Sequence, residues 1–186
     1  MLERLGYDKN VKLEFNANRL SGLWLLIIGS VIIIATIVGG KFVLNPIIFM
    51  TGFGVGFYLT NFNKAIVSKF MDGELSKFQE KMANIGVLSL FPLIFVLGGS
   101  FIPRSDWRMM WLGALLATGI HFLPFYFSHG KSMIYLATIC SVLAIIGMFN
   151  KEVPFIYFGV ADGIVKILFG VNLLFFQKRN RVYKLC

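Results

Sequence analysis

The sequence predicts an all-α integral membrane protein with six transmembrane helices, and two observations support this fold class. Of its 186 residues, 57% are hydrophobic and 16% are aromatic, and the mean hydropathy is +0.76. A soluble domain of this size has neither a core nor a surface that accommodates so many apolar side chains. Six apolar segments also approach the roughly 20 helical residues that cross a bilayer core about 30 Å thick. We therefore expect a single transmembrane domain over residues 1–186.

Residues 1–19 mix charged and apolar side chains, which indicates a cytoplasmic amphipathic head lying at the lipid headgroups. Acidic residues interrupt this stretch, and no short apolar core with a small-residue cleavage site is present, so we expect no cleaved signal peptide. The apolar segments after the head are the expected spans, namely residues 20–38, 42–60, 83–102, 107–127, 132–149 and 154–176.

The second span contains the run TGFGVGFY, in which Gly52, Gly54 and Gly56 recur. A glycine series can cradle phosphate, but this one follows no strand and precedes no lysine. Gly52 and Gly56 instead place two small residues on one helix face, which lets a neighbouring helix approach closely. A locally unwound segment that lines a cavity is the alternative interpretation.

The connection at residues 61–82 carries apolar residues at helical spacing, among them Ile66, Phe70 and Phe78. Such spacing is typical of an amphipathic helix at a membrane surface. We therefore expect a cytoplasmic amphipathic loop here, with a docking site for a protein partner as the alternative.

Prolines mark a weak internal repeat. Pro46, Pro103 and Pro154 each lie in the short outer connection, or the first helical turn, ahead of an even-numbered span. Because proline is favoured at helix starts, this pattern indicates three helical hairpins in series.

The distribution of basic residues predicts the orientation. Thirteen Lys and Arg residues lie in the head, the 61–82 loop, the connection between spans four and five and the tail, against four in the opposite connections. This bias places both termini, including the basic tail at 177–186, in the cytoplasm of a multi-pass protein of a plasma or bacterial inner membrane. The net charge of +9 then faces membrane lipids with anionic headgroups. No basic stripe alternates with exposed aromatic residues in a soluble region, which argues against a nucleic-acid partner.

The sixth span carries Asp162 and Lys166 inside an otherwise apolar helix. Each such charge costs roughly 2.5 to 3.5 kcal/mol at a helix centre, so protein must shelter the two side chains. They lie four residues apart and can meet on one helix face, or each can find a partner on a neighbouring helix. Gly159 and Gly163 flank this face and indicate tight helix packing.

His121 is the third ionisable residue within the spans, and Asn172 adds a polar group on the sixth. One hypothesis treats Asp162, Lys166, His121 and Asn172 as the lining of a proton or ion path. The other treats the two charges as a pair that fastens the helix, with His121 donating to a carbonyl that Pro124 leaves free.

Sequence patterns of catalysis and metal binding are lacking. His121 and His129 are eight residues apart, which is not the i, i+4 spacing of a helical zinc site. No nucleophile elbow or paired-carboxylate motif occurs. We therefore expect no catalytic residue, no metal and no cofactor.

The leading functional hypothesis is a transporter or channel-like protein for a small solute or ion, in which a homo-oligomer encloses the pore. The alternative is a non-catalytic accessory or stress-associated protein that binds a larger membrane complex through residues 61–82. An intramembrane enzyme acting on lipid is the third hypothesis.

Overall fold

The computed structural model describes residues 13–176, and the regular elements within this range are all helical, which confirms the all-α prediction for the described residues. The predicted tail at 177–186 and most of the predicted head lie outside the described residues. Six long helices carry the structure: α1 (Asn18–Ile37), α2 (Pro46–Asn61), α4 (Lys77–Leu97), α5 (Trp107–Ile120), α7 (Ser132–Phe149) and α8 (Phe155–Val171). Five short elements connect or extend them: η2 (Gly40–Phe42), α3 (Lys64–Phe70), η3 (Gly99–Arg104), α6 (Tyr126–His129) and the π-helical turn η4 (Asn172–Phe176).

Four helices of the described range are long and apolar enough to cross a membrane, against six expected from the sequence. They are Asn18–Ile37, Lys77–Arg104, Ser132–Phe149 and Phe155–Phe176. The other two long helices, α2 and α5, have 16 and 14 residues, about 24 and 21 Å at the α-helical rise. They are shorter than the apolar segments that contain them.

The ends of the two shorter helices have local causes. Asn45 caps α2 by accepting from the backbone N–H groups of Ile47 and Ile48, with Pro46 at the first helical position. Helix α5 ends at Ile120, and the chain continues in tight turns toward Pro124. A proline disfavours helix at the residue before it and has no N–H to donate. The predicted fourth span is therefore a helix of 14 residues followed by turns.

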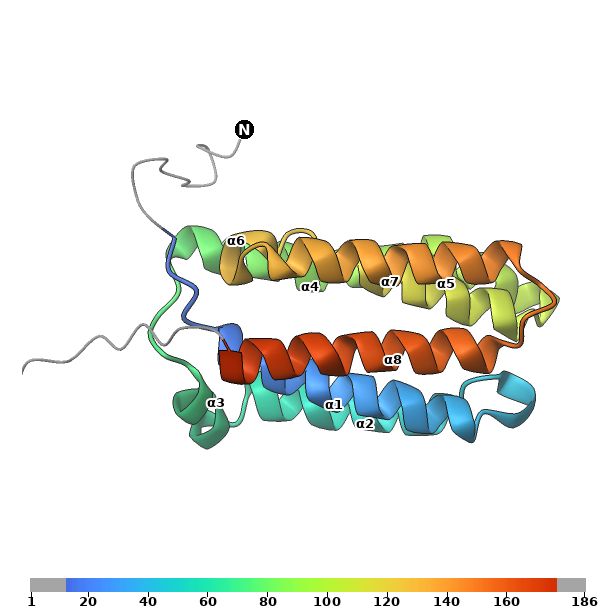
Figure 1. Cartoon of the computed structure of the whole chain (residues 1–186), viewed down its shortest axis with the longest axis horizontal. Coiled ribbons are helices and arrows are strands. Elements are labelled where there is room, and N and C mark those ends of the chain that lie inside the picture. The colour runs from blue at the N-terminus through green and yellow to red at the C-terminus, as the bar shows by residue number, and fades with distance from the viewer. Residues whose placement is uncertain (1–12, 177–186) are drawn as a thin grey trace, which may run out of the picture.

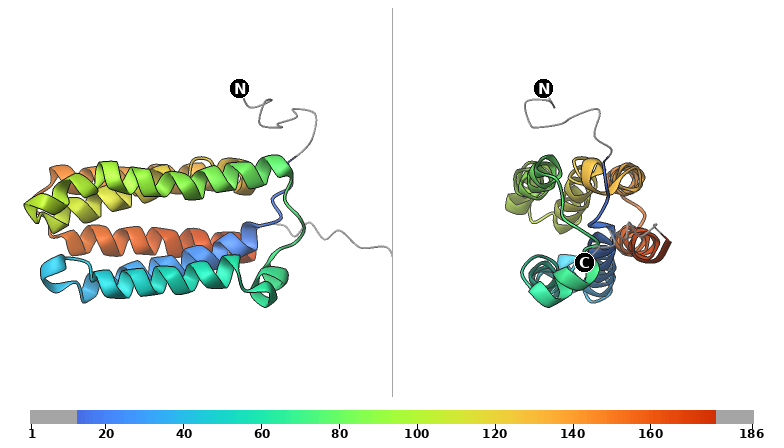
Figure 2. Two further views of the ribbon diagram at one scale, coloured as in Figure 1. Left: turned by 180° about the vertical axis from the view of Figure 1, so that it is seen from behind. Right: turned by 90° about the vertical axis from the view of Figure 1, so that its left-hand side faces the viewer.

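The six long helices lie side by side in two layers (Figures 1 and 2). One layer holds α2, α1 and α8, with α1 in the middle, and the other holds α4, α5 and α7, with α5 in the middle. Consecutive helices pair as α1 with α2, α4 with α5 and α7 with α8, and the α7–α8 contact joins the layers along one edge. Elements α3 and α6 and both ends of the described chain lie at the same end of the bundle.

Arg108, at the start of α5, holds the end of α7 and the turn between α7 and α8. Its guanidinium donates to the carbonyl oxygens of Gly147, Asn150 and Val153 at 2.7 to 2.8 Å. The last carbonyls of a helix have no partner within the helix and carry partial negative charge. Arg108 therefore caps α7 and fixes the turn that leads into α8.

The most extensive helix contact is between α1 and α8, which run antiparallel with glycines facing each other. A Cβ atom added at Gly29 would lie 2.6 Å from the carbonyl oxygen of Gly163, and one at Gly22 would lie 2.7 Å from that of Gly170. These are backbone atoms, which cannot move aside as a side chain can. The absence of side chains at these positions is therefore what lets the two backbones touch.

Gly52 and Gly56 on α2 also face α1, but they meet side chains and not backbone. A Cβ atom at Gly52 would lie 2.5 Å from Val31 Cγ2, and one at Gly56 would lie 2.8 Å from Ile27 Cγ2. The two glycines thus leave room for the side chains of α1.

Gly163→Ala is expected to lower the free energy of unfolding by about 1–3 kcal/mol, because the added methyl overpacks the contact between α1 and α8. Gly54→Ala is the matched control, since nothing lies within 4 Å of a Cβ atom at Gly54 and alanine is the better helix former. Thermal unfolding of the purified protein in detergent measures both. Equal melting temperatures for the two variants would contradict the glycine contact.

Candidate functional site

Asp162 and Lys166 form an ion pair one turn apart on α8, with Lys166 Nζ donating to Asp162 Oδ2. Both side chains are only 1% exposed. Helix α7 covers the pair with Cys140, whose Sγ lies 3.7 Å from Lys166 Nζ. The second carboxylate oxygen, Oδ1 of Asp162, has no hydrogen-bond partner within residues 13–176. The two charges are thus enclosed by protein, and each is the main partner of the other.

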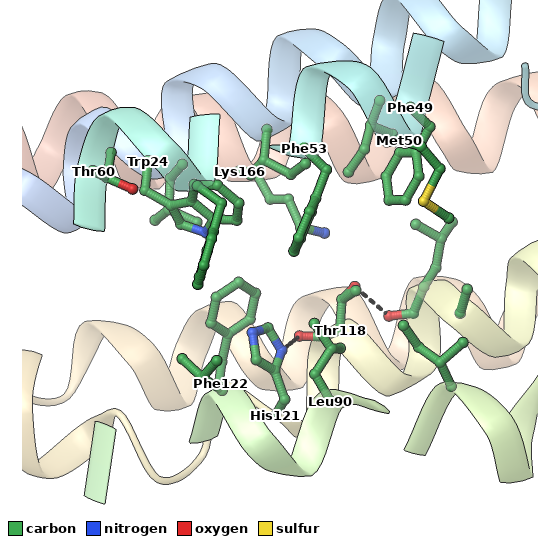
Figure 3. A pocket seen from close by; sticks show the side chains of 18 of the residues that line it. Trp24, Phe49, Met50, Phe53, Thr60, Leu90, Thr118, His121, Phe122 and Lys166 are labelled. Atoms are coloured by element: carbon green, nitrogen blue, oxygen red, sulfur yellow. Dashed lines mark hydrogen bonds between the residues drawn. The ribbon is translucent and has the colours of Figure 1, made fainter. Parts of the chain in front are cut away.

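A cavity of about 400 Å³ lies between the two helical layers and is lined almost entirely by apolar side chains. We call it the central cavity. Helices α1, α2 and α8 form one wall of the cavity, which includes Trp24, Phe49, Phe53 and Lys166. Helix α4, helix α5 and the turns after α5 form the facing wall (Figure 3), which includes Leu90, Trp111, Thr118, His121 and Phe122. Its volume lies at the lower end of the range for sites that bind drug-sized ligands.

The central cavity has its open side between α2 and α4. Helix α2 packs against α1 and α3, whereas α4 packs against α5 and α6. The two helices form the same edge of the bundle in the end-on view (Figure 2), and residues of both line the cavity. Met50, a lining residue on α2, is 61% exposed. The cavity is therefore open at the side of the bundle, where Met50 lies.

His121 lies directly after α5 and is 8% exposed. Its Nδ1 is 2.5 Å from the carbonyl oxygen of Thr118. Its ring packs on Phe122 and Phe125, with centroid distances of 4.2 and 5.8 Å. Lys166 lies on the facing wall (Figure 3), with Nζ 6.0 Å from the centre of the Phe122 ring. The structure therefore brings His121 and Lys166 to one cavity, with an aromatic ring between them.

His129 lies on α6, outside the four candidate spans. Its ring connects α6 to the first turn of α1. Its Nδ1 lies 3.2 Å from Oδ1 of Asn18 and its Nε2 lies 2.9 Å from Oγ of Ser21. An amide oxygen can only accept, so Nδ1 carries the proton and the Ser21 hydroxyl donates to Nε2. Complete burial lowers the pKa of His129 to about 4.

The remaining predicted site residue, Asn172, lies apart from the others. It begins the π-helical turn after α8, is exposed, and does not line the central cavity. Gly159 and Gly163 instead lie beside the ion pair, where they face Thr36 and Gly29 of α1. Within the described part of the chain, no three His, Cys, Asp or Glu side chains are grouped so as to hold a metal ion.

Three features of the site were not identified from the sequence. Cys140 lies next to the ion pair, the Thr118 carbonyl binds His121, and Trp24 forms part of the cavity wall. Cys140 and Trp24 belong to apolar segments in which every position looks suited to packing. Thr118 gives no sequence signal either, because it contributes a backbone carbonyl that any residue three positions before His121 would supply.

A protein-family model matches most of the chain. The family of unknown function DUF6609 matches residues 8–183. No curated protein and no solved structure matches the chain.

Neutralising either charge alone, by Asp162→Asn or Lys166→Met, is expected to destabilise the protein by about 3–5 kcal/mol, because the remaining charge stays buried without its partner. The double variant should be more stable than either single variant. Melting temperatures in detergent measure this, with Lys151→Met and Glu152→Gln as exposed controls in the turn before α8. If the stability lost by the double variant equals the sum of the losses of the two single variants, the two charges do not depend on each other.

The protein should lose stability as the pH falls from about 6.5 to about 4. The unfolded chain protonates His129 near its ordinary pKa of 6.5, whereas the buried ring protonates only near 4, so acid favours the unfolded state over this window. The loss is on the order of 2–3 kcal/mol from this residue, and it is negligible above about pH 7.5. His129→Gln should flatten the curve of melting temperature against pH. An unchanged curve would exclude His129 as a cause of acid sensitivity.

Proposed function

We propose that this chain, which belongs to the DUF6609 family of unknown function, binds a largely apolar ligand in its central cavity. The observation that supports the proposal is the cavity itself, which is about 400 Å³ in volume and lined by aromatic and aliphatic side chains. Binding sites for small molecules are typically concave and apolar, with a few polar groups that fix orientation. The wall of the central cavity has few polar side chains, among them His121 and Ser21.

The opening between α2 and α4 suits a ligand that arrives from the bilayer. We place all six long helices across the membrane, with α2 and α5 as short spans, so that the side of the bundle faces lipid. An apolar molecule concentrated in the hydrocarbon then reaches the cavity without crossing an aqueous phase. The many apolar side chains exposed on the bundle surface, including Phe91, Phe95 and Phe149, fit the same environment.

We also propose the orientation predicted from the sequence, which the positions of three basic residues support. Lys64, Lys69 and Lys131 lie on or next to α3 and α6, at the end of the bundle that holds both ends of the described chain. We assign this end to the cytoplasm, where basic residues near the bilayer contact anionic headgroups.

The contacts favour an apolar ligand over the ion or polar solute of the transport hypothesis. A path for ions needs polar groups in series, and such groups must be available to the ion. Asp162 and Lys166 are instead paired and 1% exposed, and Asn172 lies outside the cavity. Binding of an apolar ligand remains compatible with carriage of that ligand within or across the bilayer. One chain lines the cavity, so the site needs no homo-oligomer to enclose it.

Quenching of tryptophan fluorescence tests the proposal, because Trp24 and Trp111 line the cavity and bromine quenches an indole that it contacts. The probe is a long-chain hydrocarbon brominated at mid-chain, added to the protein in detergent. We expect saturable quenching that an unbrominated chain reverses by competition. Quenching that never saturates, or that no competitor reverses, would contradict the proposal.

A substitution that fills the cavity sharpens this test. Ala114→Phe places an aromatic ring on the cavity wall and should weaken probe binding roughly tenfold or more, since overpacking costs about 1–3 kcal/mol. Val142→Phe makes a similar change on the exposed surface of α7, away from the cavity, and should bind as the parent does. Melting temperatures confirm that both variants are folded.

A further inference from the structure

If the central cavity binds a ligand as proposed, one ring nitrogen of His121 decides which chemical group that ligand carries. The carbonyl oxygen of Thr118 can only accept a hydrogen bond, so the Nδ1 atom that lies against it carries the proton. A charged imidazolium buried here would need an anionic partner, and the nearby carboxylate, Asp162, is already paired with Lys166. The ring is therefore neutral, with a lone pair on Nε2.

Nε2 of His121 faces the central cavity and lacks a donor. Figure 3 shows the ring directed into the cavity with only Nδ1 bonded. Among the described residues none donates to Nε2, and the ring's neighbours Phe122 and Phe125 have no polar hydrogen to offer. The His121 side chain is more than nine-tenths buried. When an apolar molecule fills the cavity, it displaces any water from Nε2, and an acceptor left without a donor is unfavourable. A bound molecule that supplies a donor therefore gains affinity over one that does not.

The two polar side chains of the wall that the sequence or the structure places near His121, those of Thr118 and Lys166, already have partners. The Thr118 hydroxyl donates to the carbonyl of Leu115. The ammonium of Lys166 already contacts Asp162 and Cys140 and is almost inaccessible. An acidic head group would therefore find no free cation, and would bring its own lone pairs against that of Nε2.

We infer that the ligand of the central cavity is an apolar molecule with a hydroxyl group, which donates a hydrogen bond to Nε2 of His121. Long-chain, isoprenoid and ring-fused alcohols are the chemical classes that combine such a body with such a group. The aromatic walls hold the apolar body, and His121 fixes where the hydroxyl end lies.

Competition against the brominated probe tests the inference with four unbrominated molecules of matched chain length: a primary alcohol, its methyl ether, the alkane and the carboxylic acid. The ether keeps the oxygen but has no hydrogen to donate. The parent protein should bind the alcohol about 3- to 10-fold more tightly than the ether, as expected for one neutral hydrogen bond.

Variants of His121 assign the preference to Nε2. His121→Phe removes the acceptor and should reduce the alcohol preference to less than twofold while binding of the ether is kept. His121→Gln restores a side-chain carbonyl and should recover part of the preference, which a merely structural role of the histidine would not produce. If His121→Phe does not fold, His121→Gln and the competitor series on the parent protein still decide the question.

The outcomes separate the two proposals. Saturable probe binding with equal affinity for alcohol and ether would overturn the hydroxyl inference and leave the apolar site standing. A preference that persists in His121→Phe, or a preference for the acid that is lost in Lys166→Met, would also overturn it. Absence of saturable binding by any of these molecules would instead overturn the proposed function.

Discussion

The contact between α1 and α8 is the constraint on which the rest of the structure depends. Because Gly29 and Gly163 leave no side chain between the two backbones, α1 covers the face of α8 next to Asp162. Helix α7 covers the pair from another side with Cys140. Two charges in an apolar bundle are tolerated only when protein encloses them and each has a partner. The small residues are thus what makes the buried pair possible.

The same contact sets the shape of the central cavity. Helix α1 is held against α8, and α2 is held against α1 through Gly52 and Gly56, so this layer is compact. Trp24 of α1 packs edge to face on Phe53 of α2, with a centroid distance of 5.2 Å. Phe53 in turn stacks on Phe57, with a centroid distance of 6.1 Å. Their rings form a continuous wall. Helix α4 belongs to the other layer and packs on α5, which leaves space between the layers on the side away from α7 and α8.

The sequence predicts the helices and the ionisable residues of the site better than it predicts the site itself. Apolar segments locate all six long helices, because burial in lipid or protein requires long apolar runs. Spacing of four residues suffices to place Asp162 and Lys166 on one face. The shortness of α5 was missed, because its apolar segment continues through the turns around Pro124 and only the local backbone shows where the helix ends.

The central cavity could not be predicted, for a related reason. Its wall combines residues from helices far apart in the chain, and Phe53 or Trp111 would look the same in sequence if it packed against a neighbour or bordered empty space. His121 shows the same limit. One hypothesis from the sequence made it a donor to a carbonyl that Pro124 leaves free, whereas its Nδ1 bonds to the carbonyl of Thr118. Its other nitrogen acquires a role only because a cavity lies beside it.

The central cavity is expected to be open to lipid and occupied by an apolar molecule. A density map of the protein in lipid nanodiscs, with an antibody fragment bound to aid alignment, tests this in one measurement. We predict elongated density between Trp24, Phe53 and His121, with α2 and α4 apart. A map in which α2 packs directly against α4, or in which a chain of water runs past Lys166 from one end of the bundle to the other, would contradict it.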